Sequence, residues 1–453
     1  MATVLTPSKP VAVNPLKMSQ PLGAAYAFLG MDRCMPVMHG SQGCTSFGLV
    51  LLVRHFREAI PLQTTAMNEA TTILGGLDNI EKAILNIRNR AKPDLIAICS
   101  TGLTETKGDD VHAWLKLIRE RRPEISDTQI VYVSTPDYVG AFQDGWANAV
   151  CALIDALVVP APRRDPQRIN VLPGSHLTPA DIGELRDIIE SFDLIPGFLP
   201  DLSRSLDGHI PDDFSPTTLG GTTLRDAREM GSAVATLAIG EQMRPCARRM
   251  QERTGTPFEL FDRLTGLEAN DRLLCWLSAI SGNPVPERWR RQRSQLLDAM
   301  LDSHFFLGGK NVAIGAEPDL LWGMGMLLAE MGCHISCAVT TTQSPLLERM
   351  PTDVVRIGDL EDLEDGAAGS DLMVTHSHGR QAANRLGIAF HRCGLPMFDR
   401  LGAAHRCMVG YRGTRETLFE VANLLLADTS RHAVNPGTWK LPPATLSAVR
   451  DAN

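Results

Sequence analysis

Short apolar runs that alternate with amphipathic stretches constrain this chain more than any other feature of its sequence. Residues 94–99 and 129–133 are two such runs, and amphipathic segments at 111–122 and 142–158 follow them. Apolar strands of about five residues separated by helices are typical of a parallel sheet that helices cover on both faces. The pattern therefore predicts an α/β fold.

The same pattern starts again twice further along the chain. A linker rich in proline and charge at 159–166 precedes a strand at 168–172 and a helix at 178–191, and a strand at 310–315 begins a third series. We predict three successive Rossmann-like domains, each with a parallel sheet flanked by helices. Between the second and third series, residues 283–306 read as one long helix. The predicted segments are an N-terminal arm at 1–30, α/β domains at 31–160, 167–306 and 308–430, and a C-terminal tail at 431–453.

Composition and charge exclude several classes of function. The chain is 44% hydrophobic and 21% charged, and no window approaches the roughly 20 uncharged apolar residues of a membrane helix. The N-terminus has no apolar core before a cleavage site, so we expect a cytoplasmic protein without a membrane partner. The net charge is −8 without a long basic run, which predicts no nucleic-acid partner.

One cysteine lies in a setting that suits metal chemistry. Cys44 ends the run His39-Gly-Ser-Gln-Gly-Cys44, among small turn-forming residues. We expect a loop here, because glycine lets a bulky metal cluster approach the backbone and thiolates are the usual ligands of iron–sulfur clusters. A lone cysteine cannot hold such a cluster by itself, since a [4Fe-4S] cluster takes four ligands.

The remaining candidate residues favour structural roles. Cys333 and Cys337, four positions apart on a predicted strand, are interpreted as core thiols, and Cys34 as a ligand or a packed thiol. His376 and His378 follow a predicted strand, where two histidines in a polar loop are more often solvated than ligating. Asp109 and Asp110 at a helix start are interpreted as a cap.

No motif in the chain completes a catalytic site. The turns at 100–104 and 315 lack the glycine pattern of dinucleotide or phosphate loops, and no Gly-x-Ser-x-Gly elbow is present. No set of acid, base and nucleophile is visible, so no catalytic residue is assigned and an enzymatic activity of this chain is left open.

Several motifs together resemble the β-subunit side of the nitrogenase component 1, or molybdenum–iron protein, family. The resemblance runs from about residue 11 to about residue 425. Further motifs resemble the branch of that family that takes part in iron–molybdenum cofactor biosynthesis. The motifs of the family lie at residues 14–17, 19–23, 39–44, 61–67, 100–105, 108–110 and 135–137, and those of the branch at 199–203, 206–209, 282–286, 291–296 and 355–363.

The resemblance implies how Cys44 is used. In the nitrogenase β-subunit, cysteines stand at the positions of Ser19 and Gly102, and only Cys44 remains here. The family pattern then implies that Cys44 is this chain's single metal ligand to a [4Fe-4S] cluster shared with a partner subunit. Cys34 has no counterpart among the family's ligands and is interpreted as a packing thiol.

The resemblance also implies partners and a cargo. The partner subunit is expected to be NifE, in an α2β2 heterotetramer that holds the iron–molybdenum cofactor precursor transiently. NifB is expected to donate this precursor, and the iron protein NifH to dock over the interfacial cluster. On this reading the chain is half of an assembly scaffold.

Two other hypotheses stay open at this point. The chain could be the catalytic β-type subunit of a nitrogenase-like reductase, either nitrogenase itself or the light-independent protochlorophyllide reductase. It could also be a plain α/β ligand-binding protein in which Cys44 is structural. Iron content separates the first alternative from a scaffold, because a nitrogenase interface holds a larger cluster.

Overall fold

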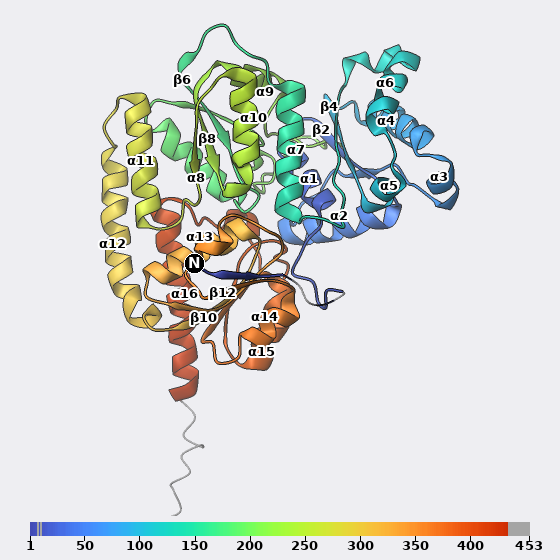
Figure 1. Cartoon of the computed structure of the whole chain (residues 1–453). Coiled ribbons are helices and arrows are strands. Elements are labelled where there is room, and N and C mark those ends of the chain that lie inside the picture. The colour runs from blue at the N-terminus through green and yellow to red at the C-terminus, as the bar shows by residue number, and fades with distance from the viewer. Residues whose placement is uncertain (7–8, 10, 434–453) are drawn as a thin grey trace, which may run out of the picture.

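Three all-parallel sheets form the framework of the computed structural model, which describes residues 1–6, 9 and 11–433. Figure 1 shows the three units around a common centre, with the first in blue, the second in green and the third in orange. The predicted fold class is confirmed: each sheet is flanked by helices, and every strand pairing between named strands is parallel. Within the described residues no helix is long and apolar enough to cross a membrane.

The first sheet has the strand order β3-β2-β4-β5. All six residues of both β2 and β4 are buried, as expected for strands covered on two faces. Its strands are β2 (Cys34–His39), β3 (Gln63–Thr64), β4 (Leu95–Ser100) and β5 (Gln129–Val133), and its helices are α1 (Gln20–Leu29), α2 (Gln42–Phe56), α3 (Glu69–Leu74), α4 (Leu77–Ala91), α5 (Gly102–Lys107), α6 (Val111–Arg121) and α7 (Phe142–Leu157).

The second sheet has the order β7-β6-β8-β9, and two long helices pack outside it. The helix predicted at 283–306 is wrong at its start, because Gly282 ends a preceding helix in the left-handed region (φ 73°) and the next helix begins only after Pro286. The elements are β6 (Asp165–Leu172), β7 (Ile195–Phe198), β8 (Ala233–Ile239), β9 (Phe258–Phe261), α8 (Pro179–Glu190), α9 (Leu224–Glu229), α10 (Arg244–Thr254), α11 (Leu267–Ser281) and α12 (Glu287–Leu307).

The third sheet has the order β1-β12-β11-β10-β13-β14 and takes its edge strand from the start of the chain. β1 (Thr3–Leu5) pairs with β12 in parallel, so the predicted N-terminal arm contributes a strand to this sheet. The other elements are β10 (Asn311–Gly315), β11 (His334–Thr340), β12 (Val354–Ile357), β13 (Leu372–Thr375), β14 (Ala389–Arg392), α13 (Pro318–Glu330), α14 (Leu360–Gly366), α15 (Arg380–Leu386) and α16 (Gly410–Ala433). The predicted tail overlaps the end of α16, and its residues 434–453 lie outside the described part of the chain.

Helices α1 and α7 cross at two glycines. A Cβ atom at Gly23 would lie 1.9 Å from the carbonyl oxygen of Phe142, and one at Gly145 would lie 1.9 Å from the carbonyl oxygen of Gln20. Only glycine permits this distance between the two backbones. All ten residues of α1 are buried, between α7 and the strands β2 and β4, and the start of α1 lies against the start of α7.

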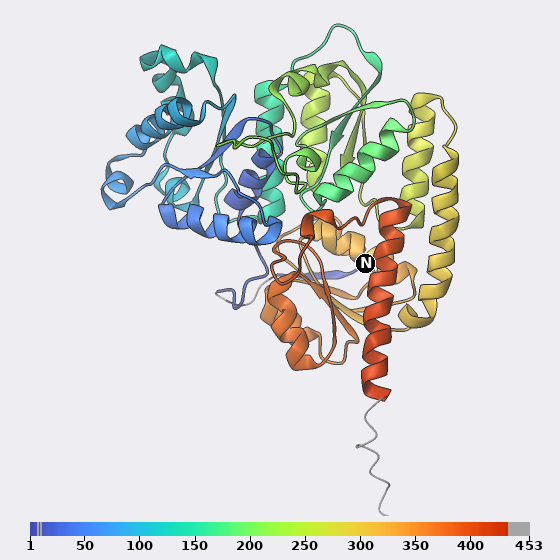
Figure 2. The same cartoon turned by 180° about the vertical axis from the view of Figure 1, so that it is seen from behind.

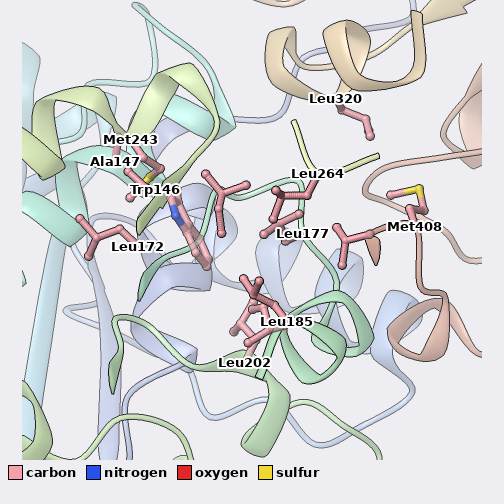
Figure 3. Packing of buried hydrophobic residues seen from close by; sticks show 14 of the residues in the cluster. Trp146, Ala147, Leu172, Leu177, Leu185, Leu202, Met243, Leu264, Leu320 and Met408 are labelled. Atoms are coloured by element: carbon pink, nitrogen blue, oxygen red, sulfur yellow. The ribbon is translucent and has the colours of Figure 1, made fainter. Parts of the chain in front are cut away.

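One hydrophobic core runs through all three units. Figure 3 shows Trp146 of α7 beside Met243 and Leu172 of the second unit, with Leu320 of the third unit and Met408 further along the same cluster. The Trp146 ring also donates a hydrogen bond from Nε1 to the carbonyl oxygen of Pro173 (2.9 Å), which satisfies its buried N–H group. The units therefore fold against one another through shared apolar contacts.

Buried histidines join the third unit to the rest of the chain. The Met397 N–H donates to Nδ1 of His55, at 2.8 Å, and Nε2 of His376 lies 3.1 Å from the carbonyl oxygen of Leu16. Burial lowers the pKa of both imidazoles from 6.5 to about 4, so both are neutral near pH 7. The neutral form is required at His55, because protonation of Nδ1 would place two donors against each other.

The first prediction concerns the crossing of α1 and α7. Gly145→Ala should lower the free energy of unfolding by about 1–3 kcal/mol, because the added Cβ meets a backbone oxygen and the two helices must move apart. Chemical denaturation monitored by circular dichroism measures the change. Gly183→Ala in α8 is the control, since a Cβ there meets nothing within 4 Å. That variant should gain about 0.5–1 kcal/mol from helix propensity; equal losses in both variants would contradict the crossing.

The second prediction concerns pH. The unfolded chain protonates His55 near pH 6.5, whereas the folded chain holds it neutral to about pH 4. The unfolded state therefore binds more protons in this range, and the free energy of unfolding falls as the pH falls below 6.5. His55→Gln keeps an acceptor for Met397 but does not titrate, so its slope with pH should be smaller by up to about 1.4 kcal/mol per pH unit.

Urea unfolding at several pH values between 5 and 7 measures this slope. The exposed His334 on β11 provides the control, since His334→Gln should leave the slope of the parent chain unchanged. Parallel pH profiles for the parent chain and His55→Gln would refute the role given to the buried imidazole.

Candidate functional site

Cys44 lies in the first turn of a helix, and the predicted loop is wrong at this position. β2 ends at His39, and α2 begins at Gln42 after the two-residue turn of Gly40 and Ser41. The Cys44 side chain is exposed, with Sγ 3.6 Å from the Ser41 hydroxyl. The sequence pattern did not predict the strand β2 or the early start of α2, because the glycines around Cys44 suggested a longer turn.

A cavity of about 450 Å³ opens beside Cys44, between the first and third units. Cys44 is the one thiol that lines it within the described residues, and no group of three or more potential metal ligands is found there or elsewhere in the described part of the chain. Polar groups reach the cavity from several elements. They are Asn14, Lys17, Ser19, Thr101, Asp137 and His378.

Asp137 fills the side-chain space of position 102. Gly102 is the first residue of α5, and a Cβ atom built on it would lie 2.0 Å from Oδ1 of Asp137. A cysteine at this position would require the carboxylate to move away. The cavity beside Cys44 is thus shaped for a carboxylate where a second thiol would otherwise fit.

Hydrogen bonds fix the loop that carries Asp137. The Thr135 backbone N–H donates to the Ser100 hydroxyl at 2.7 Å, and the Thr135 hydroxyl donates to the Ser100 carbonyl at 2.8 Å. The Glu105 carboxylate accepts from the hydroxyls of Ser100 and Ser134. These contacts tie the ends of β4 and β5 together beside the cavity.

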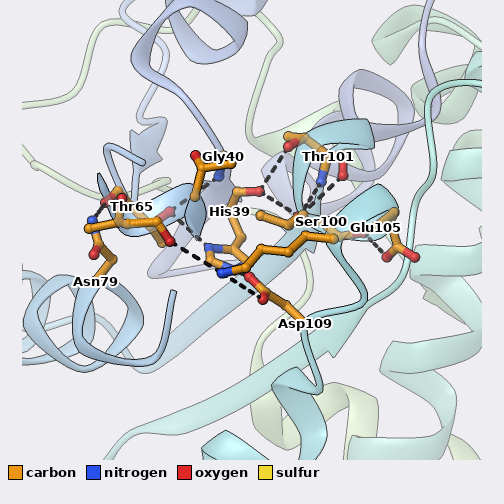
Figure 4. A network of polar contacts seen from close by, with 12 residues as sticks. His39, Gly40, Thr65, Asn79, Ser100, Thr101, Glu105 and Asp109 are labelled. Carbon is orange, nitrogen blue, oxygen red and sulfur yellow. Dashed lines mark hydrogen bonds and ion pairs between the residues drawn. The ribbon is translucent and has the colours of Figure 1, made fainter. Parts of the chain in front are cut away.

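A second polar network lies under the turn that leads to Cys44 (Figure 4). The Thr65 hydroxyl lies 2.9 Å from Nδ1 of His39 and accepts from the Gly40 N–H at 3.2 Å. The hydroxyls of Thr101 and Thr104 both donate to the carbonyl oxygen of His39. The end of β2 is therefore held from both sides, which fixes the start of α2 and with it Cys44.

The adjacent acids Asp109 and Asp110 have different roles, so the prediction that both form a cap is half wrong. Asp110 caps α6 by accepting from the Ala113 N–H at 3.0 Å. Asp109 points inward, with Oδ2 3.4 Å from Nε2 of His39 and Oδ1 3.3 Å from the Lys107 ammonium. Burial lowers the pKa of His39 to about 4 although Asp109 opposes the shift, so the imidazole is neutral at pH 7. The sequence pattern gave no signal for this partner, because His39 lies seventy residues earlier.

The two histidines after β13 are not equivalent, and the expectation that they are solvated is wrong for one. His376 is buried against Leu16, whereas His378 is half-buried and lines the Cys44 cavity. Their rings meet edge to face, with centroids 5.1 Å apart. The third unit thus contributes an imidazole to the wall of the cavity.

Four further cysteines considered in the sequence analysis are buried or half-buried thiols. Cys34 lies in β2 and Cys99 in β4, and both are fully buried. Burial raises the pKa of Cys99 to about 12 and that of Cys34 well above its ordinary value, so both stay protonated. Cys333 is buried and Cys337 half-buried, and burial raises their pKa values to about 12 and about 11. These positions agree with their interpretation as packing thiols.

Comparison with known proteins places the chain near nitrogenase. The profile of the family described as nitrogenase component 1 type oxidoreductase matches residues 19–426. The chain is 58% identical to a protein of Bradyrhizobium diazoefficiens named nitrogenase iron-molybdenum cofactor biosynthesis protein NifN, over 98% of this chain and 96% of that protein. A protein of the same name from Nostoc sp. is 51% identical over 94% and 96% of the two chains.

A solved structure supports the same relation. The chain superposes on a structure entitled "Nitrogenase Cp1 at pH 6.5" with a TM-score of 0.89 and 31% identity, over 94% of this chain and 95% of that one. The resemblance seen in the sequence motifs, including the branch named for cofactor biosynthesis, is confirmed by these matches.

The third prediction tests the inward position of Asp109. Asp109→Asn should lower the free energy of unfolding by about 1–3 kcal/mol, because Lys107 and His39 lose a buried carboxylate. Asp110→Asn is the matched control, since asparagine caps a helix about as well as aspartate and the change should stay within about 0.5 kcal/mol. Urea denaturation of both variants measures the difference. Equal effects would show that the two acids are interchangeable.

Proposed function

Because the chain belongs to the nitrogenase component 1 type oxidoreductase family, we propose that it is a subunit of a scaffold for nitrogenase iron–molybdenum cofactor biosynthesis. On this proposal it pairs with NifE in an α2β2 complex, and a precursor made by NifB is matured there. The names of the NifN relatives support the role in cofactor biosynthesis.

The observation that carries the proposal is the single thiol at the cavity. The residues present fit one corner of a [4Fe-4S] cluster: Cys44 is exposed on the cavity wall, and the lysine and imidazole of Lys17 and His378 line the same space. Positive and hydrogen-bonding groups suit an anionic thiolate-ligated cluster. The other ligands would come from the partner, and the bound cluster would supply one-electron transfer.

The face of α2 next to Cys44 is suited to a partner subunit. Phe47, Val50 and Val53 follow Cys44 at intervals of three residues and are exposed by 67%, 51% and 39%. Residues three apart are neighbours on a helix surface, so Phe47 lies beside Cys44 and Val50 beside Phe47. An exposed apolar patch next to the ligand is what a cluster shared between two subunits requires, because the partner must cover the cluster from water.

The central cavity among the described residues offers little room for the cargo. The cavity where the three units meet measures about 70 Å³ and is lined mostly by apolar side chains such as Leu320 and Met408. A single water needs about 10–15 Å³ on the same measure, so this space holds only a few waters. We therefore propose that the partner subunit binds the precursor and that residues of this chain line the neighbouring side of its site. On the same proposal, NifH docks over the interfacial cluster.

The second candidate is a catalytic β-type subunit of a nitrogenase-like reductase. Its support is the close structural match to the solved nitrogenase chain. The position of Asp137 argues against it, because the carboxylate occupies the space that a thiol at position 102 would need. Iron content of the purified complex separates the two, since a scaffold interface needs about half the iron of a nitrogenase interface.

The fourth prediction tests the ligand assignment. Cys44→Ala in the complex purified with its partner should lose cluster iron or change the electron paramagnetic resonance signal of the reduced cluster. Cys275→Ala is the control, because Cys275 is also exposed but lies on α11 in the second unit. Metal analysis and spectroscopy of the two variants measure the effect. An unchanged iron content and signal in Cys44→Ala would overturn the proposal.

A further inference from the structure

Two cysteines far apart in the sequence meet between α7 and α10. The Sγ atoms of Cys151 and Cys246 lie 3.2 Å apart, in hydrogen-bonding contact. The two residues are separated by 95 positions, so nothing in the sequence pattern indicates the pair. A disulfide needs an S–S distance of about 2.05 Å, and a small movement of either side chain brings the sulfurs to it.

The two thiols differ in access. Cys246 is fully buried and its thiol donates to the carbonyl oxygen of Ala147 at 3.2 Å. Cys151 is half-buried, at the wall of a cleft of about 580 Å³. One sulfur can therefore be reached from solvent, while the other can be reached only through the first.

Their environments also separate them chemically. The hydrogen bond with Cys246 lowers the pKa of the Cys151 thiol against the effect of burial, with help from the Arg249 guanidinium and opposition from Asp155. Burial raises the pKa of Cys246 well above its ordinary value. Cys151 is thus the thiol that ionises first, and the thiolate is the form that attacks.

Most of the charged side chains that line the cleft in front of Cys151 are basic. Its α6 wall presents Lys116 and Arg119, both exposed, together with His112. Asp155 on α7 is the one acid among the described residues that line it, and it is paired with Arg249 at 2.7 Å. The excess of basic over unpaired acidic side chains in the cleft suits a ligand that carries carboxylates.

We propose that Cys151 and Cys246 form a redox-active dithiol site that reacts with an anionic low-molecular-weight disulfide of the glutathione class. The Cys151 thiolate attacks one sulfur of the disulfide, and the other sulfur leaves as a thiolate. Cys246 then gives up its proton to solvent and attacks Sγ of Cys151, which expels the second thiolate. The protein dithiol is oxidised to one disulfide, and the small disulfide is reduced to two thiols.

The new bond would join two units of the chain. α7 packs on α1 of the first unit, and α10 belongs to the second unit. Oxidation would therefore link α7, which already packs on α1, covalently to α10. The disulfide would restrict movement between the first and second units. This site is separate from Cys44 and does not depend on the function proposed above.

The fifth prediction is tested on the full chain in its complex, under anaerobic conditions, with glutathione disulfide as the probe. Intact mass and peptide mapping should show a Cys151–Cys246 disulfide, with the loss of two hydrogens and no glutathione retained at either residue. The thiol of the exposed Cys275 makes no hydrogen bond with another described cysteine, so this residue should keep a glutathione adduct. Dithiothreitol should reverse both changes.

Single variants identify the attacking thiol. Cys246→Ala should leave glutathione trapped on Cys151, because the resolving thiol is missing, whereas Cys151→Ser should leave the buried Cys246 unmodified. Circular dichroism checks that both variants fold. If Cys246→Ala fails to fold, Cys151→Ser still tests the proposal, because its substitution is at a half-buried position. The proposal fails if Cys151 in the parent chain stays a free thiol while Cys275 is fully modified. It also fails if Cys151 in the parent chain keeps a glutathione adduct and forms no disulfide with Cys246.

Discussion

The contact between α1 and α7 is the constraint on which the rest of the structure depends. Gly23 and Gly145 let each helix touch the backbone of the other, and no other residue fits at either position. α7 then places Trp146 against the second unit through the hydrogen bond to Pro173. The start of α1 carries Ser19 to the wall of the Cys44 cavity. One helix crossing therefore sets both the seam between two sheets and one side of the candidate site.

The candidate site is built at the carboxyl ends of parallel strands, where loops meet at one edge of a sheet. β2 leads through Gly40 into the helix of Cys44, and β5 leads to Asp137. Buried hydrogen bonds around His39 and Ser100 hold the two loops, since buried polar groups must find partners. The site thus presents one thiol on a rigid frame, as the proposed half of a shared metal site requires.

Secondary structure could be predicted wherever the hydrophobic residues repeat with the period of a strand or a helix. The strand at 129–133 was predicted with its observed bounds. The local pattern did not predict elements that tertiary packing stabilises or that border a glycine-rich turn. Buried β2 was not predicted as a strand, because the glycines that follow it suggested a longer turn. The helices α11 and α16 gave no strong signal, since tertiary packing stabilises helices that local propensity does not mark.

The sequence by itself determined the fold class, the family resemblance and the isolation of Cys44, because strand and helix periods and short motifs are local properties of the chain. Only the tertiary structure decided which distant residues meet. Asp137 occupies the space above Gly102, Asp109 reaches His39, and Cys151 contacts Cys246. Such contacts depend on how helices cross and which strand ends lie side by side, and no spacing along a single chain encodes them.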